Sequence, residues 1–168
     1  MLLSDHSIRQ LLKEKRLIIE PEPLLKSASI RLHLSNQFAR PARNIERKTS
    51  YLLNPKQLIL GSTLESITMP HDHAGLYDGS TTLARLGVTS HMGSMLISPG
   101  SQGNLTLEIF NASDIPFMLE YKMRIGQLLI LKLDSAVERP QQSLSTYKGA
   151  THTGLVPHDP KVLYRKRT

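Results

Sequence analysis

The sequence predicts an all-β protein, built as a sandwich or barrel, with one short helix near the N-terminus. Many short segments alternate apolar and polar residues, which is the two-residue period of a β-strand. Glycine, proline and asparagine turn signals separate these segments at short intervals, as they do in sandwiches and barrels. The 168 residues show no internal repeat and no break in composition, so we predict one domain over residues 1–168.

Residues 1–20 predict the helix and a first strand. Ser4 or Asp5 can cap a helix in which Ile8, Leu11 and Leu12 recur at helical spacing. Two prolines follow directly after this segment and interrupt regular structure. The run LIIEPEP therefore predicts a strand that turns into a loop.

The run SASIRLHLSNQF predicts a half-buried strand. Ile30, Leu32 and Leu34 point to one face of such a strand, and Arg31 and His33 point to the other. We expect the apolar face to be buried and the opposite face to be exposed.

Residues 39–50 are basic and polar, and we expect a loop there. The following run, YLLNPKQLILGSTLESITMP, predicts two strands, with Asn54–Pro55 and Gly61–Ser62 as turn signals. His71-Asp72-His73 comes next. Two histidines that flank an aspartate are candidate metal ligands, but no further ligand is spaced to complete a site, so we favour a surface turn.

The strand predicted for NLTLEIFN, residues 104–111, carries one carboxylate among apolar residues. Because both faces of this strand are partly apolar, burying Glu108 is costly unless another group compensates. Arg85, in the segment TTLARLG, is the candidate partner. Two interpretations are open: a buried Glu108–Arg85 site that handles a proton, and a structural ion pair or a solvated glutamate.

The remaining segments predict two more strands and an arm. A turn at residues 111–116 separates the central strand from a strand over residues 117–121, and a further strand covers residues 125–133. Beyond Pro140 the chain is polar and interrupted by glycine and proline. We therefore predict that residues from about 141 to 168 form either a disordered tail or an arm that becomes ordered on a ligand or a neighbouring subunit.

Composition narrows the classes of function. The net charge of +7 suits polyanionic ligands such as nucleotide phosphates. Aromatic residues are scarce and tryptophan is absent, which argues against a stacking surface for nucleic acid. The apolar runs are too short to span a membrane, and the N-terminus lacks the apolar core of a secretory signal, so we predict a cytoplasmic protein.

Three segments, in this order, resemble the core of the dCTP deaminases, a family within the dUTPase-like superfamily. They are LYDGSTTLARLG, ISPGSQGNLTLEIFN and MRIGQLLILKL. The resemblance implies a dUTPase-like distorted jelly-roll or β-barrel, assembled as a homotrimer with active sites between subunits. It also implies a cytosine deoxynucleotide as substrate, with dCTP converted to dUTP and ammonia in pyrimidine nucleotide metabolism.

The resemblance also implies catalytic roles. Glu108 takes the place of the general acid/base. Arg85 would position the attacking water and the base, with the Thr81 hydroxyl beside it. Ser94 would offer its backbone carbonyl to the water. His91 also matches the family, although a structural histidine is the alternative.

The chemistry then needs no cofactor. Cysteine is absent, so a cysteine-held zinc ion of the kind that activates water in other deaminases is not available. Mg²⁺ enters only as a companion of a nucleoside triphosphate. The substrate-binding residues implied by the resemblance are Ser80, Thr82, His91, Ser94, Ser98, Gln127, Tyr147 and Lys148.

Several positions depart from the family pattern. Ser80 replaces the arginine of a Gly-Arg-Ser-Ser segment that grips phosphate, and Leu96 replaces a second phosphate-binding arginine from across the subunit interface. Ser98 replaces an aspartate that meets the deoxyribose, and Arg31 replaces the aspartate of a Val-Asp-Leu segment. In the arm, Gln141, Thr146 and Ala150 stand where the family has tyrosine, lysine and glutamine.

These losses leave two functions open. Each charge-assisted hydrogen bond to phosphate contributes roughly 1.5–3 kcal/mol, so the lost cations remove on the order of 5 kcal/mol of binding. The chain is then either a metal-independent deaminase with a rearranged phosphate site, or a non-catalytic trimer that binds a nucleotide or a protein partner. Hydrolysis of dUTP is disfavoured, because Ser98 cannot act as a base at neutral pH without a helper.

Overall fold

The structure is a computed structural model that describes residues 1–40 and 45–141. The all-β prediction is confirmed, because short strands make up most of the regular structure. The elements are α1 (Asp5–Lys13), β1 (Ile18–Glu20), β2 (Leu24–Lys26), β3 (Ser29–Ala39), β4 (Glu46–Arg47), β5 (Ser50–Leu53), β6 (Leu58–Thr68), β7 (His73–Gly79), α2 (Thr81–Arg85), β8 (Val88–Thr89), β9 (Leu96–Ile97), β10 (Gln102–Asn111), β11 (Phe117–Glu120) and β12 (Arg124–Lys132).

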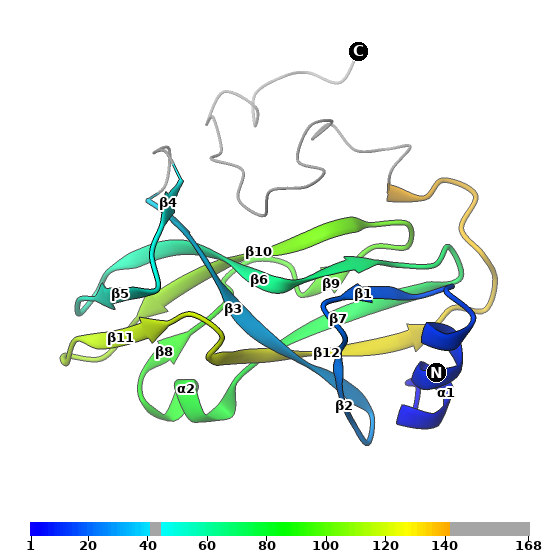
Figure 1. Ribbon diagram of the computed structural model, residues 1–168, viewed down its shortest axis with the longest axis horizontal. Helices are drawn as coiled ribbons and strands as arrows, with labels where there is room; N and C mark the ends of the chain where they lie inside the picture. Colours follow the sequence, from blue (N-terminus) through cyan, green and yellow to red (C-terminus); the bar gives the residue numbers. More distant parts are fainter. Residues whose placement is uncertain (41–44, 142–168) are drawn as a thin grey trace, which may run out of the picture.

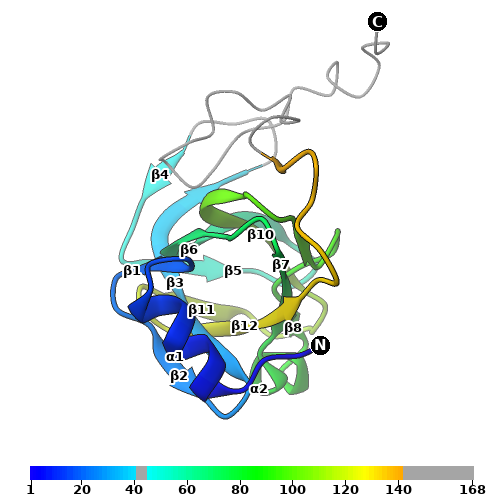
Figure 2. The same ribbon diagram turned by 90° about the vertical axis from the view of Figure 1, so that its right-hand side faces the viewer.

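Most strands belong to one antiparallel sheet that curls around the core. Its main path runs β8-β10-β6-β3-β12-β7-β9, with β1 added to β6 and with β2 and β4 added to β3. Strands β5 and β11 form a separate pair. Figures 1 and 2 show the curled sheet, with α1 at the end of the molecule where β12 finishes. The chain start joins that end through a bridge between Leu2 and Leu131.

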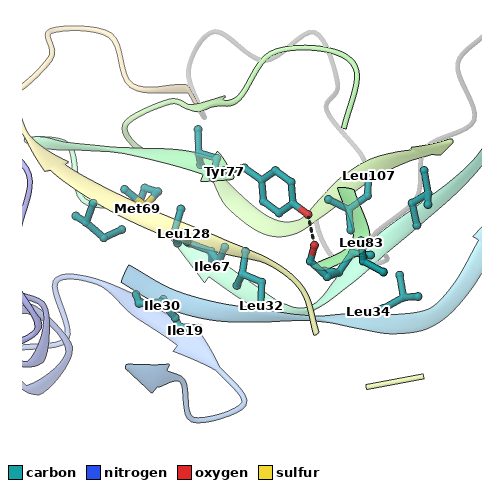
Figure 3. Close-up of a cluster of buried hydrophobic side chains, with 14 of the residues drawn as sticks. Ile19, Ile30, Leu32, Leu34, Ile67, Met69, Tyr77, Leu83, Leu107 and Leu128 are labelled. Atoms are coloured by element: carbon teal, nitrogen blue, oxygen red, sulfur yellow. Dashed lines mark hydrogen bonds between the residues drawn. The ribbon is translucent and has the colours of Figure 1, made fainter. Parts of the chain in front are cut away.

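The core is filled by the apolar faces that the alternating patterns predict. Ile30, Leu32 and Leu34 on β3 are fully buried, whereas Arg31 and His33 on the other face are only half-buried. Leu107 of β10 packs in the same cluster, which Figure 3 shows together with Tyr77 and Leu83. The helix α1 adds Ile8 and Leu11, as its helical spacing predicts. Burial of this surface is the main force that stabilises the curled sheet.

The turn predicted at Gly61–Ser62 is wrong, because both residues lie inside the continuous strand β6. The glycine is needed there for packing. A Cβ atom at Gly61 would lie 2.8 Å from Ile109 Cδ1 and 3.2 Å from Leu34 Cδ1. The other predicted turn, at Asn54–Pro55, does separate β5 from β6.

Two further segments differ from the predicted elements. Residues 39–50 are not all loop, because Glu46 and Arg47 form β4 against the end of β3. Residues 81–85 form the helix α2, which the sequence pattern did not predict. Five residues are too short to show a helical period, which is why the pattern missed it.

The surface turn predicted at residues 71–73 is confirmed for His71 and Asp72 but is wrong for His73, which is buried at the start of β7. Its Nδ1 lies 2.9 Å from Asp72 Oδ1, and Arg16, just after α1, pairs with the other carboxylate oxygen. Burial opposes ionisation of Asp72, but the hydrogen bonds from His73 and Arg16 outweigh it and hold its pKa below the usual value. The contacts among Arg16, Asp72 and His73 therefore join the end of α1 to the start of β7. Among residues 1–40 and 45–141, no three histidine, aspartate or glutamate side chains gather as metal ligands.

Neither helix in the described part of the chain has the length and apolarity that crossing a membrane would need.

Candidate active site

Glu108 lies on β10, where its neighbours Leu107 and Ile109 anchor the strand in the core. The alternation turns its carboxylate to the opposite face, where it is half-buried. Its Oε2 accepts the backbone N–H of Met92 at 3.3 Å. A Cβ atom at Gly93 would lie 3.9 Å from both carboxylate oxygens, so the chain passes close to the acid at this point.

Arg85 does not reach Glu108 within one chain. It lies at the end of α2 and is exposed, and its side chain forms no hydrogen bond or ion pair with any residue that the structure describes. Thr81 lies at the start of the same helix and is also exposed. The two residues predicted to assist Glu108 thus share one short helix, and the acid lies on another element.

The residues after β8 form a loop beside the acid. His91 is half-buried, with its ring edge-on to Tyr77 and the ring centroids 5.4 Å apart. Ser94 is exposed, and its hydroxyl accepts the backbone N–H of Leu96 at 3.1 Å. Several apolar side chains of this loop, and of the start of β9 that follows it, are exposed. They are Met92, Met95 and Leu96.

Ser98 begins the turn between β9 and β10. Its carbonyl accepts the backbone N–H of Ser101 at 3.1 Å. Gly100 has a left-handed φ of 78°, and a Cβ atom there would lie 2.6 Å from Pro140 Cβ. Gln141 donates its backbone N–H to the Pro99 carbonyl at 2.8 Å, so the chain after β12 is fixed to this turn.

Tyr77 connects the loop to the sheet. It is buried, its hydroxyl lies 2.8 Å from Ser90 Oγ, and it occupies the space beneath Gly126. Burial raises the pKa of Tyr77 to about 12, opposed by the Ser90 hydrogen bond and aided by the negative charges of Asp78 and Glu108. Tyr77 is therefore neutral at physiological pH, and it packs against the His91 ring of the loop beside Glu108.

A separate pocket of about 300 Å³ opens on the outer face of the sheet. It brings together three of the predicted residues with one cation from each of β2, β3 and β12. The lining residues are Lys26, Arg31, Gly79, Ser80, Thr81, Arg124, Gly126 and Gln127.

Strand register explains how these side chains meet. Gln127 on β12 pairs with Arg31 on β3 and with Asp78 on β7, so these three side chains share the outer face. A bulge between Arg124 and Gly126 turns Arg124 to that face, while Ile125 stays fully buried. Arg124 Nη2 then lies 3.5 Å from Thr82 Oγ1, on the exposed side of α2.

Gln127 is held at both ends of its amide. Its Nε2 donates to Asp78 Oδ2 at 2.8 Å, and its Oε1 accepts the Ser29 hydroxyl at 2.9 Å. It lines the pocket, although its polar atoms already have protein partners.

The structure therefore brings some of the predicted residues together in two places, the Glu108 loop and the cationic pocket. Thr82 and Arg85 on α2 and Ser98 in the β9–β10 turn line neither place. Tyr147 and Lys148 lie outside the described residues. Sequence reasoning missed Lys26, Arg124 and Tyr77 as parts of the site. Only Arg31 carried a signal, because the alternation of β3 turns it away from the core, whereas the bulge that turns Arg124 leaves no mark in the pattern.

Comparison with known proteins identifies the family. Residues 41–133 match the family model described as dCTP deaminase-like. A protein of Mycolicibacterium smegmatis named "dCTP deaminase, dUMP-forming" is 36% identical, and the match covers 89% of this chain and 92% of that protein. This chain belongs to the dCTP deaminase family. A protein of Nocardia farcinica with the same name is also 36% identical, over 89% of this chain and 87% of its own.

Solved structures show that this family member has the dUTPase-like fold. A 2'-deoxycytidine 5'-triphosphate deaminase from Agrobacterium tumefaciens superimposes with a TM-score of 0.64 at 19% identity. That match covers 77% of this chain and 46% of the Agrobacterium chain, which is less than half of its length. The dUTPase of EIAV superimposes with a TM-score of 0.54 at 17% identity, over 74% of this chain and 94% of the other.

Proposed function

We propose that this protein deaminates a cytosine deoxynucleotide, dCTP first among them, and that Glu108 carries the proton. The observation that supports this most is the placement of Glu108. It is a half-buried carboxylate on a core strand, beside a loop that approaches to within contact distance, in a chain of the dCTP deaminase family.

The reaction replaces the exocyclic amine at C4 of cytosine with an oxygen from water. As general base, Glu108 takes a proton from the water while its oxygen forms a bond to C4. As general acid, it returns that proton to the ring nitrogen. It then takes the proton of the new C4 hydroxyl and passes it to the amine, so that the C–N bond breaks, ammonia leaves and a C4 carbonyl remains. The Met92 N–H bond to Oε2 fixes one carboxylate oxygen and leaves the other to face the substrate. We infer that these residues need no metal for this step.

The missing partners of Glu108 support an assembly in which two chains complete one site. Arg85 and Thr81 are exposed on α2, and the loop beside Glu108 presents outward apolar residues such as Met92 and Leu96. We infer that α2 of one subunit docks on this loop of another in a homotrimer. Arg85 and Thr81 would then reach the acid across the interface and position the water.

Deamination is tested by measuring ammonia released from dCTP, dCMP and deoxycytidine. We expect release from dCTP, and we expect Glu108→Gln to abolish it. Glutamine keeps the shape of the side chain but has no carboxylate that can accept and return a proton. Glu120→Gln is a matched control, since it removes an exposed carboxylate on β11 that the mechanism does not use. No release from any of the three substrates at high enzyme concentration contradicts the proposal.

The nucleotide product of this reaction is either dUTP or dUMP. Ser98 stands where the family has an aspartate, which favours release of dUTP, because serine is a poor base for hydrolysing it further. The names of the relatives favour the second candidate, formation of dUMP. Chromatography of the nucleotides distinguishes the two, because dUMP appears with pyrophosphate, whereas dUTP accumulates without it.

A non-catalytic nucleotide-binding trimer is the alternative, favoured by the loss of phosphate-binding arginines at Ser80 and Leu96. A thermal-shift series with the same nucleotides decides this point. Stabilisation without ammonia release supports the alternative, and turnover of dCTP rejects it.

A further inference from the structure

The pocket on the outer face of the sheet gathers three positive charges from three strands. Lys26 comes from β2, Arg31 from β3 and Arg124 from β12. Strands β2 and β12 flank β3 on either side, so the register of the sheet places the three cations around one opening. No carboxylate is among the residues that line it.

These cations are not neutralised by the part of the protein that the structure describes. The side chains of Lys26 and Arg31 form no hydrogen bond or ion pair with any residue in 1–40 or 45–141. Arg124 has one contact, to the neutral Thr82 hydroxyl at 3.5 Å. Asp78 is the acid on the same face, and its carboxylate accepts the Gln127 amide. Arg31 is half-buried, so an anion that binds it is screened less by salt than on an open surface.

The remaining polar groups also suit an anion. The Ser80 and Thr81 hydroxyls line the same opening and can donate to an oxygen. A volume of about 300 Å³ is at the lower end for small-molecule sites and fits a chain of phosphates better than a whole nucleotide. Three fixed cations match the repeated charge of such a chain.

We propose that this pocket binds the polyphosphate chain of the nucleotide directly, with Lys26, Arg31 and Arg124 doing the neutralisation that Mg²⁺ commonly does for nucleotides. The inference rests on the proposed function only for the source of the phosphates, a nucleoside triphosphate. It relocates the positive charge that Ser80 no longer provides to three residues on the neighbouring strands.

The coordination chemistry of Mg²⁺ also favours binding of the metal-free polyphosphate in this pocket. The ion is commonly held by one or two carboxylates together with the substrate phosphates, at octahedral oxygen positions. This pocket offers no free carboxylate, and its three cations repel a divalent ion. The metal-free polyphosphate, which carries more negative charge, is therefore the preferred ligand.

Inorganic tripolyphosphate tests the pocket without the base or the sugar. Calorimetric titration of the wild-type protein in EDTA should show binding, and excess Mg²⁺ should weaken it. Each of Lys26→Gln, Arg31→Gln and Arg124→Gln should raise Kd about 10- to 100-fold, the loss expected for one charge-assisted hydrogen bond. Arg47→Gln removes an exposed arginine on β4 that does not line the pocket, and it should leave Kd unchanged.

Binding that requires Mg²⁺, or a Kd that the three variants do not change, overturns the inference. Lys26 and Arg124 are exposed, so their variants keep the test open if Arg31→Gln does not fold. The results separate this inference from the proposed function. Tripolyphosphate binding without ammonia release from dCTP supports the inference about the pocket and contradicts deamination. Deamination that requires Mg²⁺ supports the proposed function and contradicts the inference about the pocket.

Discussion

At the scale of single residues, Tyr77 makes the fold less stable as the pH becomes alkaline. Burial raises its pKa to about 12 in the folded protein, compared with 10.0 for the free side chain. Between these values the unfolded chain has lost the phenol proton and the folded chain retains it. Stability is thus fully present below pH 10 and falls as the pH rises towards 12.

We expect this residue to cost roughly 2–3 kcal/mol of unfolding free energy over those two pH units. Urea unfolding of the wild type and Tyr77→Phe from pH 8 to 12 measures it. The wild type should be more stable at pH 8, where it keeps the hydroxyl bond to Ser90, and the variant should be more stable near pH 12. Parallel curves for the two proteins over this range contradict the assignment.

Residue types explain part of what the sequence predicts about the site. Glu108 was recognisable because a carboxylate in an apolar strand is unusual, and it does lie on a core strand. Its expected pairing with Arg85 was not accessible to pattern reasoning, because spacing along a chain does not say which subunit contributes each side chain. The pairing stays a prediction for the assembled protein.

At the scale of elements, β6 depends on one glycine. A methyl group at Gly61 would meet the ends of two flexible side chains, Ile109 and Leu34. We expect Gly61→Ala to destabilise the fold by about 1–3 kcal/mol through overpacking, measured by urea unfolding.

A second substitution isolates the cause. Ile109→Val removes the Cδ1 atom that lies 2.8 Å from the added methyl group. It should cost about 0.5–1.5 kcal/mol alone and should recover stability in combination with Gly61→Ala. Simple addition of the two costs would show that the strain comes from elsewhere.

Periodicity predicted the long strands well and their irregularities poorly. The faces of β3 and β10 follow directly from alternation, because one face of each is committed to the core. Gly61 was read as a turn because glycine marks both turns and close approaches, and only the packing partner distinguishes them. The bulge before Gly126 has no signature in residue types, so the turn of Arg124 into the pocket was not predictable.

At the scale of the whole molecule, the outward apolar loop beside Glu108 bears on assembly. We expect gel filtration with light scattering to give three times the mass of the chain. Leu96→Glu should yield monomers and abolish ammonia release, because an unpaired carboxylate buried in an interface costs several kcal/mol. Leu96 is 54% exposed in the single chain, as a residue that a second subunit covers should be.

Leu52→Glu provides the matched control for this test. Leu52 is 49% exposed and lies on the separate β5–β11 pair, away from the loop. It should keep both the trimer and the activity. A monomeric wild type that releases ammonia would mean that Glu108 works without a neighbouring helix.

The anchoring of Gln141 to Pro99 makes the β9–β10 turn the exit point of the described chain. The Gln141 backbone N–H donates to the Pro99 carbonyl, and Pro140 lies over Gly100, so the chain leaves the sheet beside Ser98. Any side chain larger than hydrogen at position 100 would place a Cβ atom 2.6 Å from Pro140 Cβ and would push this exit away from the turn.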